Sequence, residues 1–244
     1  MIQLQNITKS YEQKVLNDVS LDVESGHTVS LIGPSGCGKS TLLRIVMGLI
    51  PPDSGDVIIN GQPLSDEKML EQRREMGYVI QSGGLFPHLT ARENLTLVTG
   101  YLNWEKEQTE QRIEELCELT NISSSQLNRS PDELSGGQAQ RISLMRALML
   151  DPDIILLDEP LGSIDPLVRY ELQRDLRSIF KKLKKTVLLI THDLGEAAYL
   201  GDQIALMKDG AIVQRGTIKD ITGNPASAFV EQFVNAQRSP LEDV

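Results

Sequence analysis

The order of hydrophobic and polar residues along the chain predicts its strands. Near the N-terminus apolar residues alternate with polar ones, which is typical of half-buried antiparallel strands. The alternating apolar positions are Ile2, Leu4, Val19, Leu21 and Val23. Further along, apolar residues follow one another without interruption, which is typical of strands covered on both faces of a parallel sheet. These continuous runs are 27–32, 154–159 and 186–190, with shorter runs at 56–60 and 77–80 and a hairpin within 203–215.

Apolar residues spaced three and four positions apart predict helices between these strands. The predicted helices are 42–49, 65–76, 104–120, 136–149, 166–183 and 226–236. Thr90 and Glu93 have the cap-and-acid spacing of one further helix start, while 123–125 and 130–132 are interpreted as loops. From about residue 82 to 150 the chain is mostly helical, which indicates an insertion between two α/β halves.

Composition and charge exclude several classes of protein. The 244 residues carry a net charge of -10, so broad nucleic-acid binding is opposed by repulsion from the phosphate backbone. No stretch approaches the roughly 20 apolar residues that span a bilayer, and Met1–Gln5 does not resemble a signal peptide. Cys37 and Cys117 provide no disulfide framework and suit a reducing compartment. We therefore expect a cytosolic protein that contacts a membrane only through a partner.

The stretch 33–41 has the spacing Gly-x4-Gly-Lys-Ser of a phosphate-binding loop and lies between a predicted strand and a predicted helix. Its residues are Gly33, Pro34, Ser35, Gly36, Cys37, Gly38, Lys39, Ser40 and Thr41. The glycines let consecutive backbone N–H groups point into one concavity at a helix N-terminus. Lys39 is expected to reach the β- and γ-phosphates of a nucleotide, and the Ser40 hydroxyl to hold Mg²⁺. The alternative, a glycine-rich surface turn, leaves the flanking strand and helix unexplained.

Polar residues end two of the continuous apolar runs. Asp158 and Glu159 close the run at 154–159, and His192 follows the run at 186–190. Parallel strands bring their carboxyl ends to one edge of a sheet, the edge that also carries the phosphate-binding loop. Asp158 is then placed to bind Mg²⁺ through water, Glu159 to polarise an attacking water and His192 to contact a γ-phosphate. The alternatives are a strand-end cap for the acids and a structural role for the histidine.

A second glycine-rich helix start occurs within the helical insertion. It consists of Ser135, Gly136, Gly137 and Gln138. Taken alone, these residues fit a helix cap as well as an anion site. Tyr11 lies between the first two predicted strands, where it is either an ordinary surface tyrosine or a platform for a nucleotide base. Gln81 directly follows the apolar run at 77–80.

In this order the motifs resemble the nucleotide-binding subunit of an ATP-binding cassette (ABC) transporter, and the resemblance covers almost the whole chain. The motifs are 33–41, Gln81, 134–138, 154–159, Asp165 and His192. The resemblance implies an α/β fold, a P-loop NTPase core with an N-terminal antiparallel β subdomain and a helical insertion. It divides the chain into a nucleotide-binding core at 1–81 and 151–216, a helical signature subdomain at 82–150 and a C-terminal helical tail at 217–244.

The resemblance also implies a role for each motif, with ATP and Mg²⁺ as cofactors. Tyr11 would stack on adenine, and Gln81 would sense Mg²⁺ and the membrane partner. Glu159 would be the catalytic base and His192 the γ-phosphate switch, while Ser40 and Asp158 would hold Mg²⁺ together with Gln81. The chain would form a head-to-tail homodimer in which 135–137 of one copy cover ATP on the other.

Three stretches most resemble the ATPases of importers for quaternary-amine osmoprotectants such as glycine betaine, carnitine or choline. They are 84–90, 160–165 and 191–197. These importers have separate permease and substrate-binding-protein chains. Ala139 and the pair at 163–164 depart from the residues common in the family but keep their small or apolar character. The sequence ends at Val244, so we expect no C-terminal regulatory module and do not assume osmotic gating by one.

These observations lead us to expect an ATPase subunit on the inner face of the cell membrane, attached through its permease, with no nucleic-acid partner. A soluble ABC ATPase that acts on translation or DNA is one alternative, but such proteins usually carry two cassettes or a long coiled-coil insertion. An importer of another small solute, such as an amino acid, also fits the motifs. A protein that only binds nucleotide is disfavoured because Lys39, Asp158, Glu159 and His192 are all present.

Overall fold

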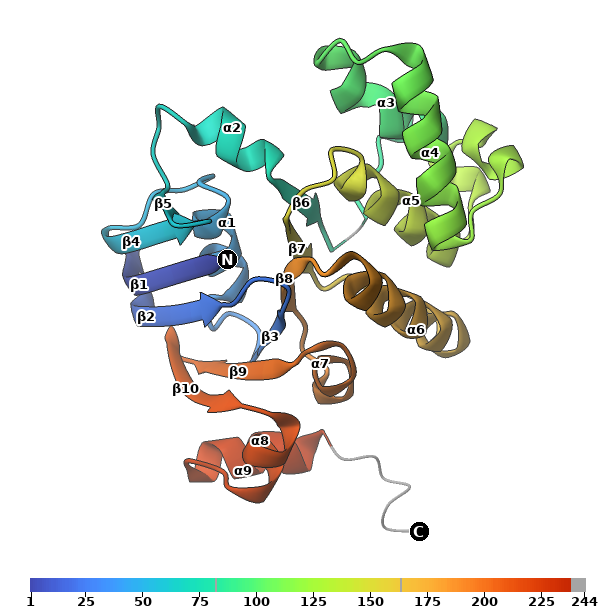
Figure 1. Cartoon of the computed structure of the whole chain (residues 1–244). Coiled ribbons are helices and arrows are strands. Elements are labelled where there is room, and N and C mark those ends of the chain that lie inside the picture. The colour runs from blue at the N-terminus through green and yellow to red at the C-terminus, as the bar shows by residue number, and fades with distance from the viewer. Residues whose placement is uncertain (82, 163, 238–244) are drawn as a thin grey trace.

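The computed structural model describes residues 1–81, 83–162 and 164–237, which contain two β-sheets (Figure 1). The first sheet is antiparallel, with strand order β2-β1-β4-β5. Its strands are β1 (Ile2–Ser10), β2 (Lys14–Val23), β4 (Ser54–Ile59) and β5 (Gln62–Pro63). Alternate apolar residues of β1 and β2 are buried and paired across the two strands, as in Leu4 opposite Leu21. The antiparallel strands predicted from alternation are therefore confirmed.

The second sheet has strand order β10-β9-β3-β8-β7-β6, parallel from β9 to β6 with β10 antiparallel at one edge. Its strands are β3 (Thr28–Ile32), β6 (Met76–Val79), β7 (Ile154–Asp158), β8 (Thr186–Ile190), β9 (Gln203–Lys208) and β10 (Ala211–Gly216). Successive residues of a strand face opposite sides, so Ile154 and Leu156 enter one core while Ile155 and Leu157 enter another. This burial on both faces explains the continuous apolar runs, and the predicted parallel strands are confirmed.

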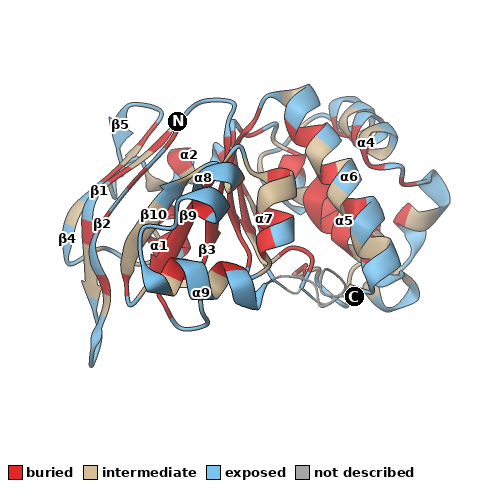
Figure 2. Ribbon diagram, turned by 90° about the horizontal axis from the view of Figure 1, so that it is seen from below, coloured by how far each residue is buried: buried red, intermediate tan, exposed pale blue. Residues whose placement is uncertain are grey.

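Helices cover both faces of the parallel sheet. Helix α1 (Lys39–Val46) lies between the two sheets and shares a core with both. Helix α6 (Pro166–Leu183) packs on the opposite face, in a core that it shares with three further helices. Helices α7 (Leu194–Leu200), α8 (Ile218–Gly223) and α9 (Ala228–Ala236) form a smaller core with β9. Figure 2 shows that the buried residues gather in the parallel sheet and on the inner sides of these helices.

The three further helices form a unit that we call the helical lobe (residues 91–148), which lies apart from the antiparallel sheet in Figure 1. It contains α3 (Ala91–Tyr101), α4 (Lys106–Thr120) and α5 (Gly136–Leu148). Thr90 caps α3 with the predicted box, accepting from the N–H of Glu93 while the Glu93 carboxylate accepts from the N–H of Thr90. Helix α5 contacts α3, α4 and also strand β6, so it joins the lobe to the parallel sheet.

Some local predictions are wrong or incomplete. Leu49 is 53% exposed rather than part of a buried helix face, because α1 ends at Val46 and Gly48 then adopts a φ of 63°. The two stretches interpreted as loops contain short 3-10 helices, η1 (Ser124–Asn128) and η2 (Pro131–Glu133). The predicted helix at 65–76 is the shorter α2 (Met69–Arg74), and α8 was not predicted. Ser82, Ser163 and the predicted tail beyond residue 237 lie outside the described residues.

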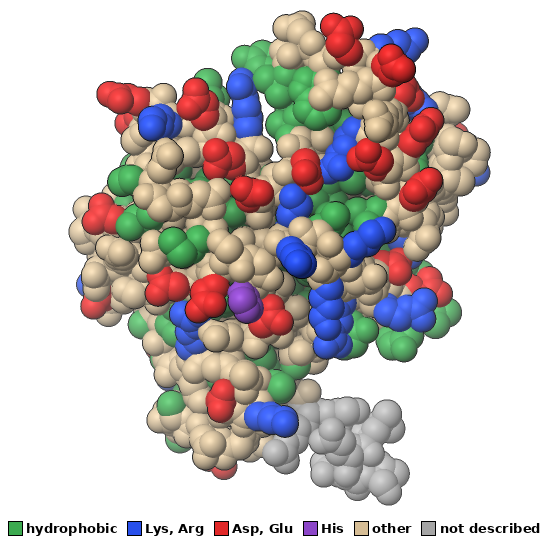
Figure 3. Space-filling view, in the orientation of Figure 1, with side chains coloured by type: hydrophobic (Ala, Val, Ile, Leu, Met, Phe, Trp, Pro, Cys, Tyr) green, Lys and Arg blue, Asp and Glu red, His purple; other side chains and the backbone are tan. Residues whose placement is uncertain are grey.

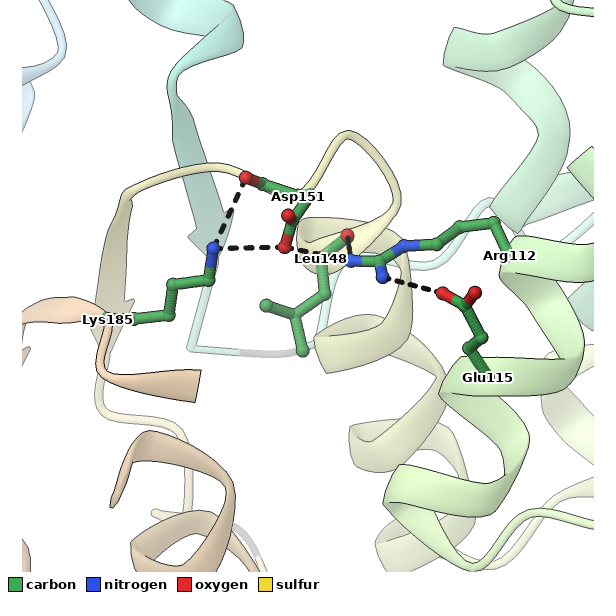
Figure 4. Close-up of polar contacts among 5 residues, drawn as sticks. All are labelled: Arg112, Glu115, Leu148, Asp151 and Lys185. Carbon is green, nitrogen blue, oxygen red and sulfur yellow. Dashed lines mark hydrogen bonds and ion pairs between the residues drawn. The ribbon is translucent and has the colours of Figure 1, made fainter. Parts of the chain in front are cut away.

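The chain returns from the helical lobe to the parallel sheet through 149–153, and this connection is held by charged side chains (Figure 4). Arg112 of α4 donates from Nη2 to the carbonyl oxygen of Leu148 at 2.8 Å and to Asp151 Oδ1 at 3.2 Å. The buried Lys185, just before β8, donates to the same Asp151 oxygen at 2.9 Å. Asp151 thus joins one cation of the helical lobe to one cation of the core, which fixes the end of α5 against the sheet.

Candidate functional site

Four strands of the parallel sheet end beside one pocket. The loop 33–38 follows β3, Gln81 lies just after β6, Asp158 ends β7 with Glu159 next, and His192 lies just after β8. The pocket has a volume of about 480 Å³. It is lined by Val15, Ser35, Gly36, Gly38, Lys39, Ser40, Thr41, Gln81, Glu159 and His192. The structure therefore brings the loop, the acid, the amide and the imidazole together at the carboxyl edge of the sheet.

The loop closes around the ammonium group of Lys39. Its Nζ donates to the carbonyl oxygens of Gly33 at 2.7 Å and Pro34 at 3.0 Å, and it lies 3.7 Å from Cys37 Sγ. Lys39 is only 6% exposed, although it lines the pocket. Helix α1 begins at the same point, and its N-cap residue Gly38 supplies no side-chain acceptor for the first N–H groups. A cation beside free helix N–H groups makes this end of the pocket favourable for an anion.

Gly38 explains why the loop lies so close to the antiparallel sheet. Its φ of 104° is in the region that favours glycine. A Cβ at this position would lie 2.7 Å from Leu16 Cδ2 and 2.8 Å from the carbonyl oxygen of Val15, so β2 leaves no room for a side chain. The glycine therefore serves both the backbone turn and the close packing of the loop.

Ser40 and Asp158 face each other, with 3.4 Å between Ser40 Oγ and Asp158 Oδ1. Burial raises the pKa of Asp158, and the neighbouring Glu159 charge adds to this, while the Ser40 hydroxyl and the cations Arg44 and Lys39 oppose it. In the described part of the chain, no three His, Cys, Asp or Glu side chains converge as a metal site of their own. A hard cation at Ser40 and Asp158 would therefore complete its oxygen shell with water or a bound ligand, as Mg²⁺ usually does.

Glu159 is the centre of the polar contacts in the pocket. Its Oε2 accepts a hydrogen bond from Gln81 Nε2 at 2.8 Å and lies 3.4 Å from His192 Nδ1. Its backbone has a φ of 46°, and its N–H donates to the carbonyl oxygen of Ile190 in β8 at 2.9 Å. The carboxylate is thus held by groups from two neighbouring strand ends while its side chain stays partly exposed.

Two of the predicted motifs do not reach this pocket. Tyr11 lies in the turn between β1 and β2, is 59% exposed, and has Lys9 Nζ 5.7 Å from its ring centroid. Ser135 caps α5, accepting from the N–H of Gln138 at 3.3 Å, while the Gln138 side chain accepts from the N–H of Ser135 at 3.0 Å. Within one chain, therefore, the second glycine-rich turn is a helix cap and is not among the described residues that line the pocket.

A comparison of the sequence with models of known protein families identifies the family of this chain. The family model described as ABC transporter matches residues 16–162, which is more than half of the chain. The chain belongs to the ABC transporter family. This match includes the phosphate-binding loop, Gln81, the second glycine-rich turn and Glu159.

Named relatives of this ABC transporter family member include ATP-binding proteins of transport and uptake systems. It is 44% identical over 240 residues to the choline transport ATP-binding protein OpuBA of Bacillus subtilis (strain 168), covering 98% of this chain but 63% of OpuBA. It is 40% identical over 234 residues to the glycine betaine uptake system ATP-binding protein YehX of Escherichia coli (strain K12), covering 96% of this chain and 76% of YehX. The chain therefore spans less than two thirds of the length of OpuBA.

A solved structure supports the fold. It is a dimeric post-hydrolysis state of an ATP-binding cassette bound to ADP and Pi, with a TM-score of 0.79 and 34% identity to this chain. The superposition covers 89% of this chain and 99% of the cassette. The ABC ATPase fold predicted from the sequence is confirmed.

One buried acid of this ABC protein was missed by the sequence analysis. Glu196, in the first turn of α7, is 5% exposed, and its Oε2 accepts from Thr191 Oγ1 at 2.8 Å. Its Oε1 is buried without a hydrogen-bond partner among the described residues. An acid three positions after Asp193 fits an ordinary helix cap, so the sequence gives no sign that this carboxyl turns inward toward Thr191. Burial raises the pKa of Glu196 to about 7.

The raised pKa of Glu196 predicts a pH-dependent stability. Between its usual value of 4.5 and about 7, the unfolded chain loses this proton while the folded chain keeps it, so the folded state loses stability as pH rises. Glu196→Gln removes this loss. We expect the variant to be more stable than the parent chain at pH 8, by about 1–3 kcal/mol, and similar to it near pH 4.5. Urea unfolding of both proteins at the two pH values measures the difference, and a pH-independent difference would contradict the prediction.

Proposed function

We propose that this chain is the ATP-hydrolysing subunit of an importer for quaternary-amine osmoprotectants such as glycine betaine, carnitine or choline. The observation that carries the ATPase part is the pocket where the phosphate-binding loop faces Gln81, Glu159 and His192. The cargo part rests on relatives named for choline transport and glycine betaine uptake. Because the chain spans only part of OpuBA, the activity, cargo and partners of the whole protein are all included in this proposal.

ATP and Mg²⁺ fit the groups that surround the pocket. Lys39 and the backbone N–H groups of 33–41 would bind the phosphates, and Tyr11 would stack on the adenine from the β1–β2 turn. Mg²⁺ would be held by the Ser40 hydroxyl, the Asp158 carboxylate and the Gln81 amide. When bound, it neutralises part of the charge on the phosphates.

The chemistry proposed for the chain centres on Glu159. The carboxylate is placed to accept a proton from a water that attacks the γ-phosphate, and Gln81 and His192 orient it from either side. His192 would also contact the γ-phosphate and so distinguish ATP from ADP. Placing these groups before the reaction lowers the cost of organising them in the transition state.

The second glycine-rich turn fits a site completed by a second copy of the chain. Ser135 and Gly136 are exposed, so a partner could approach them. We propose a head-to-tail homodimer in which 135–137 of one copy cover ATP bound to the other, giving two equal sites. Within this proposal, 1–81 and 151–216 form the nucleotide-binding core, 82–150 the signature subdomain and 217–244 the tail.

A groove between α2 and α3 fits a membrane partner. It has a volume of about 480 Å³ and contains a cluster of exposed hydrophobic side chains on a molecule that otherwise buries most of its large apolar residues. These exposed residues are Leu70, Phe86, Leu97, Val98 and Tyr101. Figure 3 shows hydrophobic side chains over α3 on the side that faces α2. Leu85 and Leu89, on either side of Phe86 in the sequence, are half-buried.

The described residues contain no helix long and apolar enough to cross a membrane. We propose that the groove binds a cytoplasmic helix of the permease and so holds the chain at the inner face of the cell membrane. A substrate-binding protein would deliver the cargo to the permease on the other side. No nucleic acid is part of the proposal, in keeping with the net charge of -10.

Tyr101→Glu tests the membrane partner. Tyr101 is 76% exposed in the groove, so a carboxylate there should block an apolar docking helix without disturbing the fold. When the chain is produced together with a candidate permease, we expect at least a tenfold loss of chain recovered with the detergent-solubilised permease. Tyr170→Glu, at a tyrosine 62% exposed on α6 outside this groove, is the matched control. Equal recovery of both variants, or recovery with ribosomes or DNA in place of a permease, would exclude this docking surface.

A further inference from the structure

The first turn of α5 packs directly against the first turns of α6. Gly137 is buried at this contact, and a Cβ built on it would lie 2.5 Å from Val168 Cγ1 and 3.7 Å from Leu172 Cδ1. Real Cβ atoms do not come this close to another carbon, so a side chain at 137 requires either the Val168 side chain or one of the two helices to shift. The position requires glycine because of a neighbour in the same chain.

The adjacent glycine has a different environment. Gly136 is exposed, and a Cβ built on it would have no heavy atom within 4 Å. The two glycines of the turn therefore have different environments. Gly136 and Ser135 form the open surface of the turn, whereas Gly137 forms its attachment to α6.

The residue that fills the space at Gly137 also belongs to the segment that follows Glu159. Val168 donates its N–H to Asp165 Oδ1 at 3.2 Å, the N-cap of α6. The next residue, Arg169, donates from Nη2 to the carbonyl oxygen of Ile164 at 3.0 Å. Ile164 and Asp165, which directly precede α6, are thus fixed to the same turn of helix that contacts Gly137.

An ion pair holds the two helices together further along. Arg141 of α5 and Asp175 of α6 form a side-chain contact in which each side chain is only about one fifth exposed. Arg141 Nε is buried without a hydrogen-bond partner among the described residues, so part of the guanidinium is enclosed at this contact between the two helices. A partly buried ion pair of this kind fixes the helix positions more firmly than a surface pair.

We propose that Gly137 and Val168 are positioning residues that set the distance between the Ser135–Gly136 surface and the segment after Glu159. This inference rests on the proposed function, in which that surface covers ATP on a second copy. Each chain would then hold two groups at a fixed distance from each other. One is the catalytic carboxylate of its own site, and the other is the surface that covers the ATP bound to its partner. A displacement of the cover by about 1 Å is enough to lower catalysis by roughly 100-fold.

The test is a rescue experiment on the full-length chain. Gly137→Ala introduces the Cβ that meets Val168, so we expect kcat for ATP hydrolysis to fall about 10–100-fold while ATP binding by the monomer stays within about twofold. Val168→Ala removes the atom that causes the clash. The double variant Gly137→Ala/Val168→Ala should therefore recover kcat to within about fivefold of the parent chain, a strongly non-additive result.

The matched control is Gly100→Ala. Gly100 lies inside α3, and a Cβ there would have no heavy atom within 4 Å, so kcat should not change. A Gly137→Ala variant that behaves like this control, or a defect that Val168→Ala does not relieve, would overturn the inference.

If Gly137→Ala does not fold, the test is made with Arg141→Met, because this variant loosens the packing of α5 against α6 without a clash. Arg141→Met should lower ATP-dependent dimerisation with unchanged monomer binding, and unchanged dimerisation would also overturn the inference.

A separate variant distinguishes this inference from the proposed function. Ser135→Arg blocks the open surface itself and should abolish ATP-dependent dimerisation, measured by light scattering with ATP in a Glu159→Gln background. If dimerisation persists in Ser135→Arg, the ATP cover is not at this turn, and the proposed dimer and the positioning role fail together. If Ser135→Arg blocks dimerisation but Val168→Ala gives no rescue of Gly137→Ala, only the positioning role fails.

Discussion

Glu159→Gln is expected to lower the kcat of ATP hydrolysis by roughly 10²–10⁴-fold, the contribution of a positioned general base. The glutamine amide keeps the size of the side chain and an oxygen that can accept the bond from Gln81, which lies 2.8 Å from Glu159 Oε2. It cannot take a proton from the attacking water. Because Lys39 and the loop 33–38 are unchanged, ATP should still bind, and the ATP-bound dimer should accumulate. Phosphate release measures the first effect, and light scattering with ATP measures the second.

The control for this variant is Glu133→Gln, which removes the same charge from an exposed carboxylate that accepts from Ser130 in the helical lobe. It should hydrolyse ATP at the rate of the parent chain. Near-normal turnover of Glu159→Gln would remove Glu159 from the catalytic role. Loss of ATP binding in the same variant would instead show that the carboxylate holds the fold of the pocket.

Much of the architecture could be predicted because buried positions are mostly apolar, so the pattern of apolar residues in the sequence shows which faces of an element are covered. A strand covered on both faces has few positions for a polar residue, so 154–158 and 186–190 are continuous runs of largely apolar residues and were correctly predicted as parallel strands. Once parallel strands are predicted, their carboxyl ends must share an edge, which places Glu159 and His192 beside the phosphate-binding loop. That these residues share one edge follows from the parallel arrangement, whereas their closeness depends on the strand order β3-β8-β7.

Features that depend on contacts between distant segments could not be predicted. The groove between α2 and α3 combines exposed residues such as Leu70 and Tyr101, which no local pattern relates to one another. Gly136 and Gly137 are the same residue type at adjacent positions, so the sequence does not distinguish them. Only the position of Val168 in the structure shows that Gly136 is exposed and that Gly137 is packed against α6. Glu196 has the spacing of a helix cap, yet its side chain turns toward Thr191 instead of solvent.

Other errors reflect signals that were present but weighed wrongly. Ser123 with Gln126, and Ser130 with Glu133, have the spacing of a capping box, and both pairs form one at the start of a 3-10 helix. They were interpreted as loops because serine and proline are also common in loops. Leu49 continues the helical spacing of α1, but Gly48 has already ended the helix, so the spacing no longer describes a buried face.

Lys39→Ala is expected to weaken ATP binding by roughly 100-fold or more, because charge-assisted hydrogen bonds to phosphate are among the strongest polar contacts in proteins. Among the described residues that line the pocket, Lys39 is the single lysine or arginine. The helix N-terminus and the loop N–H groups remain in the variant, but they carry only partial charges. Isothermal titration of ATP into the variant and the parent chain measures the loss, and Lys68→Ala, at an exposed lysine before α2, is the charge-matched control.

The same variant separates a phosphate contact from a structural role for Lys39. Its ammonium also holds the carbonyl oxygens of Gly33 and Pro34, so the loop could lose order when it is removed. Loss of loop order would weaken ADP and ATP alike. A direct contact of Lys39 with the β- and γ-phosphates should weaken ATP more than ADP, because ATP brings one more phosphate and more negative charge to the ammonium. Parent-level affinity for ATP in Lys39→Ala would show that 33–41 does not bind the phosphates, and equal losses for ADP and ATP would assign Lys39 to the loop alone.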